Sequence, residues 1–435
     1  LQADNATALG LLGRVEMDDG QLEKAHALFN ESLNSQPGQE QQYCNLGYWA
    51  LKTERPALAE EYFVAALECN RQSAAAFCGI AHARRLQGQF DVAYLHYRKL
   101  LQTGSDWDSI YSGMLTCAQH LNVHNADKEL AQDAIALLKK DGLPHQEIGR
   151  FVGAIIEQEY DLANPNAEVF LDAAAEDELL ILALQKTLMP NAGVEQLVAL
   201  LRRGIMAEVA ETASLRDELQ TLCLAIGEYA ERTGFAITAE EDEEQLAGTI
   251  NESIMAQFAV GESQEDLIGS LMISAMYGAL FHQNFAMQLG QWSLMDWPLG
   301  MQPLMAASYY NRAEEEAIKQ NFDEKADELC LAKTDVPQAW PAWSQLAYRT
   351  ETSLKTVMEQ ELGLSADNLP DTLRLMVCGA QSGQRAMELA QYLDDVEIIA
   401  VDESLANVAK GTRMAQELGM DNIVFWPWSI AQRFV

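Results

Sequence analysis

The chain has 435 residues, of which 49% are hydrophobic, which is enough for two or three domains with packed cores. Its 65 acidic residues outnumber the 29 basic ones, and the formal net charge is -36. Such a charge repels phosphate backbones and anionic lipid headgroups, so it argues against nucleic acid and membrane surfaces as direct partners. It favours a basic protein or a cationic small molecule, although an acidic surface also simply keeps a protein soluble.

Seven cysteines are spread along the chain without a C-x-x-C pair, and most fall within apolar helical patterns. This usage predicts reduced thiols in the core of a cytoplasmic protein. No apolar run reaches the roughly 18 residues that a membrane helix needs, and no secretion signal stands at the start. The sequence begins with Leu1 rather than Met, which leaves open a natural start further upstream.

Small and aromatic residues recur with a period of 34 residues over the first hundred positions. Such a period is typical of stacked pairs of antiparallel helices. A small residue in the first helix of each pair lets the second helix approach, an alanine lets the next pair pack closely, and an aromatic ring fills the gap between pairs. We therefore predict helix pairs over 6–37, 40–71 and 74–104, with a fourth, less regular pair over 108–140. The recurring sets are Gly13, Gly47 and Ala81, then Ala25, Ala59 and Ala93, then Phe29, Phe63 and Tyr97.

This pattern resembles the tetratricopeptide repeats over residues 6–104, and the resemblance implies a curved solenoid that holds another protein. We assign residues 1–142 to this helical solenoid. Repeat geometry places the partner-binding residues on first helices, and it suggests Asn45, Tyr48 and Trp49. The expected partner is a protein in the repeat groove, and the net charge favours a basic one.

Residues 143–335 are predicted to form a helical middle domain from the period of their apolar residues. The run Glu240–Glu244 predicts a solvated loop or a helix start in preference to a cation site, because it lacks a turn-forming ligand pattern. The stretch from Met287 to Met305 is rich in Met, Trp and Leu and predicts core packing, whereas an exposed face there would mark a partner surface. The scattered histidines, including His120 and His124, predict no metal site.

The pattern changes near residue 335. We assign 336–370 to a linker with an aromatic-proline element that ends at Trp343 and a helix over roughly 345–362. Beyond it, strands are predicted over 373–378, 396–401 and 423–426, and helices over 384–392 and 405–418. Strands and helices that alternate at this spacing predict a parallel sheet. The predicted fold class is therefore mainly α, followed by a partial α/β domain over 371–435.

The first of these strands leads into a loop from Gly379 to Gly383, and the second ends at Asp402. Glycines let the chain turn sharply and let backbone amides approach a ligand, and an acid at the tip of the second strand accepts hydrogen bonds from ribose hydroxyls. In the alternative interpretation these residues are purely structural, with glycines for the turn and the aspartate as a helix N-cap.

The segments Ala386-Met387-Glu388-Leu389-Ala390 and Ala400-Val401-Asp402 complete a pattern that resembles class I S-adenosylmethionine-dependent methyltransferases, in particular bacterial ones that carry tetratricopeptide repeats. The resemblance implies a Rossmann-like methyltransferase domain, of which residues 371–435 form a part. It implies S-adenosylmethionine as the cofactor, with Gly379, Gly383 and Asp402 as the cofactor-binding residues. No catalytic residue is assigned.

Two positions depart from the family pattern: Gln381 replaces a loop glycine, and Ser429 replaces an acid that meets the adenine amine. Fewer strands are predicted than this fold requires, which leaves the outer edge of the first strand bare. We expect a continuation past Val435, or else a second subunit that covers this edge. Two functions follow: methyl transfer from S-adenosylmethionine to a protein acceptor, or a non-catalytic adaptor with a degenerate methyltransferase domain.

Overall fold

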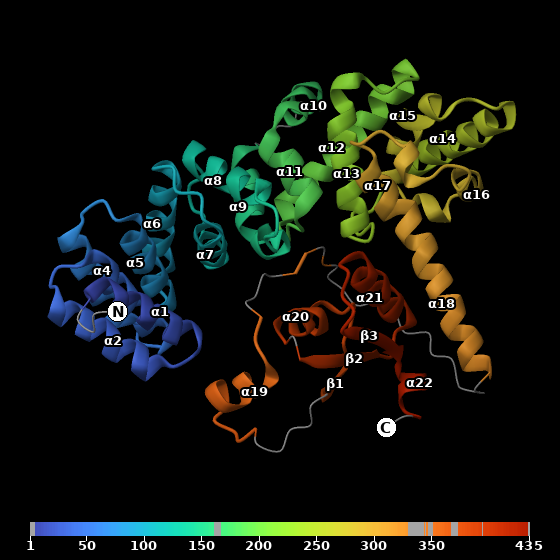
Figure 1. The fold of residues 1–435 in the computed structure, drawn as a ribbon. Helices are drawn as coiled ribbons and strands as arrows, with labels where there is room; N and C mark the ends of the chain where they lie inside the picture. The colour runs from blue at the N-terminus through green and yellow to red at the C-terminus, as the bar shows by residue number, and fades with distance from the viewer. Residues whose placement is uncertain are drawn as a thin grey trace. The chain divides into compact units, whose positions relative to one another are not determined.

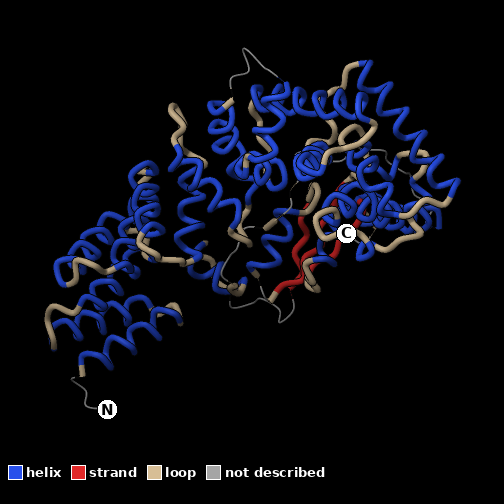
Figure 2. The backbone as a smooth tube through the Cα atoms, turned by 90° about the horizontal axis from the view of Figure 1, so that it is seen from above, coloured by secondary structure: helices blue, strands red, loops and turns tan. Residues whose placement is uncertain are grey.

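The computed structural model describes residues 5–160, 167–328, 343, 345–346, 351–366, 373–393 and 395–433. The protein is mainly helical, with a small parallel sheet near its C-terminus, as Figures 1 and 2 show. This confirms the predicted fold class at that level. The chain divides into two compact units, Leu1–Lys140 and Asp141–Val435. The finer division of the second unit into a middle domain, a linker and an α/β domain stays a prediction.

The first unit consists of helix pairs whose first members begin at residues 6, 40, 74 and 108. The 34-residue period of the sequence is therefore the spacing of these helices. The first three predicted pairs are confirmed, whereas the fourth range holds two helices that do not pack along each other as the first three pairs do. Side chains cap some of these helices: Asn5 accepts hydrogen bonds from two amides of the first helix, and Ser73 accepts one in the third pair. The helices are α1 (Ala6–Asp18), α2 (Leu22–Ser35), α3 (Glu40–Lys52), α4 (Pro56–Cys69), α5 (Ala74–Leu86), α6 (Phe90–Gln102), α7 (Asp108–Ala118) and α8 (Lys128–Lys139).

Aromatic rings seated on glycines hold neighbouring helices together in this unit. Phe63 of α4 is fully buried, and a Cβ added to Gly47 of α3 would lie 2.6 Å from its ring. A Cβ on Gly79 of α5 would lie closer still to the same ring. The Phe63 ring therefore packs against two first helices at once, which only residues without a side chain allow at these positions.

The second unit begins with short and long helices over residues 145–328. The α-helices are α9 (Gly149–Glu159), α10 (Ala167–Glu176), α11 (Glu178–Lys186), α12 (Ala192–Thr212), α13 (Asp217–Arg232), α14 (Glu241–Val260), α15 (Gln264–Ala275), α16 (Ala286–Leu289), α17 (Gln302–Met305) and α18 (Asn311–Glu328). Single turns of 3-10 helix are η1 (His145–Ile148), η2 (Leu280–His282) and η3 (Leu294–Asp296), and a π-helical turn is η4 (Ala306–Tyr310).

The acidic run Glu240–Glu244 forms the start of α14, as one of the two predicted alternatives had it. Glu243, however, is buried rather than solvated, with 4% of its surface exposed. Its carboxylate accepts hydrogen bonds from Arg202 Nε at 3.2 Å and from the Tyr277 hydroxyl at 3.1 Å. A buried carboxylate is tolerated because it is paired, and the partner comes from α12, 41 residues earlier in the chain.

The last part of the second unit is the β-α-β-α-β arrangement that the sequence predicts. Three parallel strands lie in the order β1-β2-β3, with Met376 beside Ile399 and Ile399 beside Val424. The predicted helix over roughly 345–362 is wrong in its first part, because residues 345–346 and 351–353 are not helical. The elements are α19 (Leu354–Thr356), π-helical η5 (Val357–Glu361), β1 (Leu373–Cys378), α20 (Gln384–Tyr392), β2 (Val396–Asp402), α21 (Leu405–Glu417), β3 (Ile423–Pro427) and α22 (Trp428–Ala431).

Helices α20 and α21 cover one face of this sheet. The buried cluster includes Met387 of α20, Val408 of α21 and Phe425 of β3. A Cβ on Gly383 would lie 2.5 Å from the Phe425 ring, and one on Gly411 of α21 closer still. The same device of one ring on two glycines therefore recurs in the second unit. Among the helices that the structure describes, none combines the length and apolar character that a membrane span requires.

We predict that Gly47→Ala destabilises the first unit by about 1–3 kcal/mol, because the new methyl group collides with Phe63. Urea unfolding followed by circular dichroism measures this change. Gly248→Ala is the matched control, because Gly248 also lies within a helix but a Cβ there meets nothing within 4 Å. The control is expected to stabilise the protein by about 0.5–1 kcal/mol. Equal stabilisation by both variants would contradict the packing.

Candidate functional site

The candidate site lies at the carboxyl ends of β1 and β2, where the parallel strands bring the predicted residues together. The loop between β1 and α20 adopts left-handed backbone at Gly379, Gln381 and Gly383, with φ of 67°, 52° and 92°. Glycine suits such a conformation, whereas the glutamine is strained by about 1–2 kcal/mol. The loop thus keeps the shape that a row of glycines would give it, with a side chain at its middle.

The two glycines serve different purposes. Gly383 directly precedes α20 as its N-cap and lies against the Phe425 ring, so the packing of the sheet itself excludes a side chain there. Gly379 is exposed, and a Cβ added to it would meet nothing within 4 Å. Open space in front of Gly379 would allow a ligand to approach the backbone, whereas Gly383 needs no ligand to explain it.

Asp402 ends β2 and is 8% exposed. Its Oδ2 accepts a hydrogen bond from the Gln381 amide at 2.7 Å, and its Oδ1 accepts from the Ser404 amide at 2.9 Å and from Asn407 Nδ2 at 3.0 Å. The carboxylate therefore joins the loop after β1 to the start of α21. Both oxygens are engaged by the protein itself, and a ribose diol would have to share them with these donors.

Trp343 is a part of the site whose role the sequence analysis did not identify. Its ring is 5% exposed and belongs to the core of the sheet, and its Nε1 donates to the Ser382 carbonyl at 3.1 Å. Trp343 thus supports the glycine loop from a position 39 residues earlier in the chain. The other aromatic of that element, Trp340, lies outside the described residues. Ser429 lies in α22 and is half-buried.

The residues suggested for the repeat groove are mostly turned inward. Trp49 is 3% exposed, stacks on His26 at 4.1 Å, and donates from Nε1 to the Leu22 carbonyl at 3.0 Å. Asn45 is likewise buried, at 3% exposure, beside Gln42. Tyr48 is half-buried, and burial raises the pKa of its hydroxyl. Of the three suggested residues, only Tyr48 offers part of its side chain to a partner.

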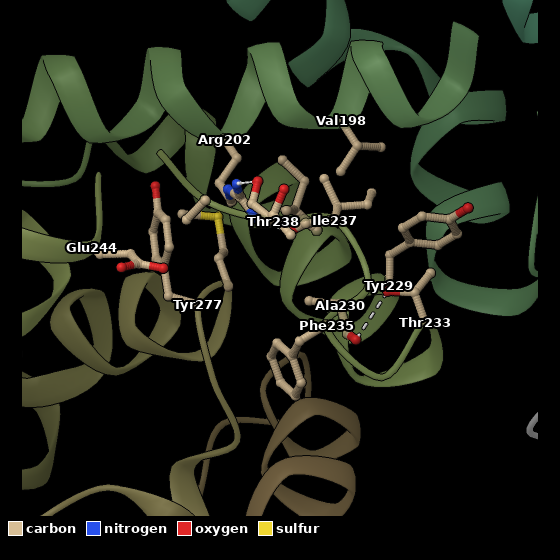
Figure 3. Close-up of a pocket in the computed structure, with 13 residues that line it drawn as sticks. Val198, Arg202, Tyr229, Ala230, Thr233, Phe235, Ile237, Thr238, Glu244 and Tyr277 are labelled. Atoms are coloured by element: carbon tan, nitrogen blue, oxygen red, sulfur yellow. Dashed lines mark hydrogen bonds between the residues drawn. The ribbon is translucent and has the colours of Figure 1, made fainter. Parts of the chain in front are cut away.

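The helical part of the second unit holds a small cavity, shown in Figure 3. Its volume is about 200 Å³, and Phe235, Met276 and Tyr277 are among its lining residues. Arg202 reaches it from α12, but its guanidinium already donates to Glu243 and to the carbonyls of Ile237 and Thr238. A cavity this small does not admit a nucleotide, because ligand pockets of that kind measure about 300–1,000 Å³.

One buried carboxyl in α13 has an altered affinity for protons. Glu228 is 8% exposed, and burial raises its pKa to about 7, against the opposing charge of Arg232. A pKa near neutrality is a property of many catalytic acids. Glu228, however, is not among the residues that line the cavity in Figure 3. Its position therefore indicates a core group of the helical part.

Among the residues that the structure describes, no three or more His, Cys, Asp or Glu side chains lie close enough together to bind a metal ion. His120 stacks on the Phe90 ring at 3.9 Å, which gives it a packing role. A scan of protein-family models gives no match to this chain, and a search of curated proteins gives none either. The assignment of a function therefore depends on the geometry alone.

We predict that Asp402→Asn loosens the loop between β1 and α20. The amide nitrogen of asparagine cannot accept a hydrogen bond, so one of the donors that Asp402 Oδ1 and Oδ2 now serve is left unpaired. The expected loss is about 1–3 kcal/mol of local stability. Hydrogen exchange of a peptide that covers residues 379–384 measures it, with faster exchange expected at Gln381. Glu397→Gln on the same strand is the control, because its ion pair with Arg374 is exposed and contributes little. Unchanged exchange in Asp402→Asn would refute the joining role.

We predict that Glu228→Gln gains stability over the natural protein as pH rises. The pKa of Glu228 in the folded protein, about 7, exceeds its ordinary value of 4.5. Between pH 4.5 and pH 7 the folded state therefore binds more protons than the unfolded state, so the stability of the natural protein falls as pH rises through this range and stays constant above it. The difference reaches about 3 kcal/mol above pH 7 and vanishes below pH 4.5. Urea unfolding at pH 5 and pH 8 measures it, with the exposed Glu218→Gln as the control. A difference that does not change with pH would contradict this.

Proposed function

We propose that this chain is a protein-binding scaffold, in which a tetratricopeptide-like solenoid supplies the docking surface and a methyltransferase-like unit serves without catalysis. One observation supports the proposal that this unit is not catalytic: the two carboxylate oxygens of Asp402 already accept three hydrogen bonds from the protein. Displacing a buried donor to admit a ribose would cost about 1–3 kcal/mol for each group left unpaired. Gln381 adds a side chain where the methyltransferases that this loop resembles carry a glycine.

The docking surface follows from the period of the first unit. Arg14, Tyr48, His82 and Thr116 hold the same position on α1, α3, α5 and α7, and each is exposed or half-buried. Burial lowers the pKa of His82 to about 4, so this imidazole is neutral at pH 7. The row is therefore polar and nearly uncharged, apart from Arg14. Such a row suits an extended or helical segment of a protein partner that brings hydrogen-bonding groups.

A second function is favoured by one observation, the open space in front of Gly379. In that function, residues 379–383 would hold S-adenosylmethionine through backbone amides, and Asp402 would release Gln381 to receive the ribose. The methyl group would pass directly from the sulfonium to a nucleophile on a protein acceptor, leaving S-adenosylhomocysteine. No residue of the described chain is assigned as the base for this step.

Isothermal titration with S-adenosylmethionine tests the proposal and separates the two functions. The scaffold predicts no heat of binding at millimolar ligand, for the natural chain and for Asp402→Ala alike. Saturable heat from the natural chain that disappears in Asp402→Ala would establish cofactor binding and overturn the non-catalytic assignment. S-adenosylhomocysteine serves as a second ligand, because a site for the cofactor also accepts the product.

Affinity capture tests the docking surface. A protein retained by the natural chain should be lost on the double substitution Tyr48→Ala and His82→Ala, and it should be retained by Asp402→Ala. Circular dichroism must show that the double variant keeps its helices, because His82 also contacts the Tyr97 hydroxyl at 2.7 Å. Retention by the double variant, or loss with Asp402→Ala, would count against the solenoid as the docking surface.

A further inference from the structure

The most exposed large apolar side chains of the described residues gather in one segment of the second unit. Met287, Leu299, Met295 and Val260 are 91%, 82%, 77% and 76% exposed, more than any other large apolar residue that the structure describes. The sequence interpretation of Met287–Met305 as core is therefore correct only for its buried members, such as Trp297 and Leu304. The alternative, an exposed face that marks a partner surface, applies to the others.

Two of these side chains are presented by a rigid loop. Trp297, 2% exposed, lies between Met295 and Leu299 in the sequence, and its Nε1 donates to the Tyr310 hydroxyl at 2.9 Å. That hydroxyl in turn donates to the Trp292 carbonyl at 2.8 Å. These hydrogen bonds thus hold the loop at Trp292 and Trp297, close in the chain to Met295 and Leu299, before any partner arrives. Such preorganisation lowers the entropy that binding would otherwise lose.

The end of α14 lies beside this loop. Phe258, near the C-terminus of α14, contacts the Trp292 ring with 5.6 Å between the ring centres. Val260 follows Phe258 by two residues and ends the helix, and Gly261 closes it in the left-handed conformation. We define the apolar tip as Val260, Met287, Met295 and Leu299. Val260 ends α14, Met287 lies in α16, and the other two lie between α16 and α17, which Figure 1 labels.

The charged residues of the segment that carries the apolar tip are all acidic. Residues 233–311 contain ten Asp and Glu but no Lys or Arg. Glu262, Glu265 and Asp296 are exposed and lie within five residues of a member of the tip. Exposed apolar side chains on a segment whose charged residues are all acidic attract a partner that combines apolar groups with positive charges, and they disfavour an acidic one.

We propose that the apolar tip docks a basic amphipathic helix of a partner protein. Methionine side chains adapt to differently shaped apolar surfaces, which suits a helix with a stripe of leucine or isoleucine. The described surface here consists of helices and turns, so it has no strand edge that a partner strand could extend. This inference goes beyond the proposed scaffold, because the surface lies outside the repeats and does not require them to bind.

The test uses the full chain and a fluorescein-labelled helical peptide of 18 residues composed of leucine and lysine, with binding followed by anisotropy. Saturable binding is expected, and the double substitution Met295→Ser and Leu299→Ser should weaken it about tenfold or more. The double substitution Leu86→Ser and Leu95→Ser removes two exposed leucines, 51% and 57% exposed, from the first unit and should leave binding unchanged. Neither pair is buried, so the fold is expected to survive.

Two further peptides separate the apolar contribution from the charge. A serine and lysine peptide of equal charge should bind at least about tenfold more weakly, and a leucine and glutamate peptide should not bind. Equal binding of the serine peptide, equal binding by the Met295 and Leu299 variant, or no binding of the leucine and lysine peptide would each overturn the proposal. None of these outcomes bears on the repeat surface, which is tested with Tyr48 and His82.

Discussion

The structure depends on one packing constraint, an aromatic ring that rests on the backbones of two neighbouring elements at once. Phe63 does this with Gly47 and Gly79 in the first unit, and Phe425 does it with Gly383 and Gly411 in the second. In each place a single methyl group would collide with the ring, so the spacing of the helices is set by residues that lack a side chain. Both units therefore tolerate little change in volume where their elements meet.

This constraint changes how the candidate site is interpreted. A glycine that opens a helix after a strand is usually attributed to a ligand, but Gly383 is required by Phe425 whether or not a ligand binds. Asp402 similarly has a structural purpose, because it joins the Gln381 amide to Ser404 and Asn407. Two of the three residues that suggest a cofactor are thus explained by folding alone. Gly379 also suits its left-handed backbone, but it differs from the other two in being exposed with open space in front of it.

The sequence predicts the secondary-structure elements well here, because they are governed by the local period of apolar residues and by the glycines and prolines that end several elements. The strand over 373–378 and the helix over 384–392 have the predicted bounds, and the helix pairs keep the 34-residue period. It predicts side-chain environment poorly wherever a distant partner decides it. Glu243 is buried because Arg202 pairs with it, and Trp49 turns inward because α2 offers the Leu22 carbonyl and the His26 ring. No pattern near either residue carries that information.

The distribution of charge connects the two proposed surfaces. A net charge of -36 would suggest that every surface of this protein selects basic partners. The row on the first helices is nearly neutral, however, so specificity there must come from shape and hydrogen bonds. The apolar tip, by contrast, lies in a stretch without a single Lys or Arg, where long-range attraction adds to apolar contact. Salt should therefore weaken binding at the tip far more than binding at the repeats, since screening acts on charge and leaves apolar contact intact.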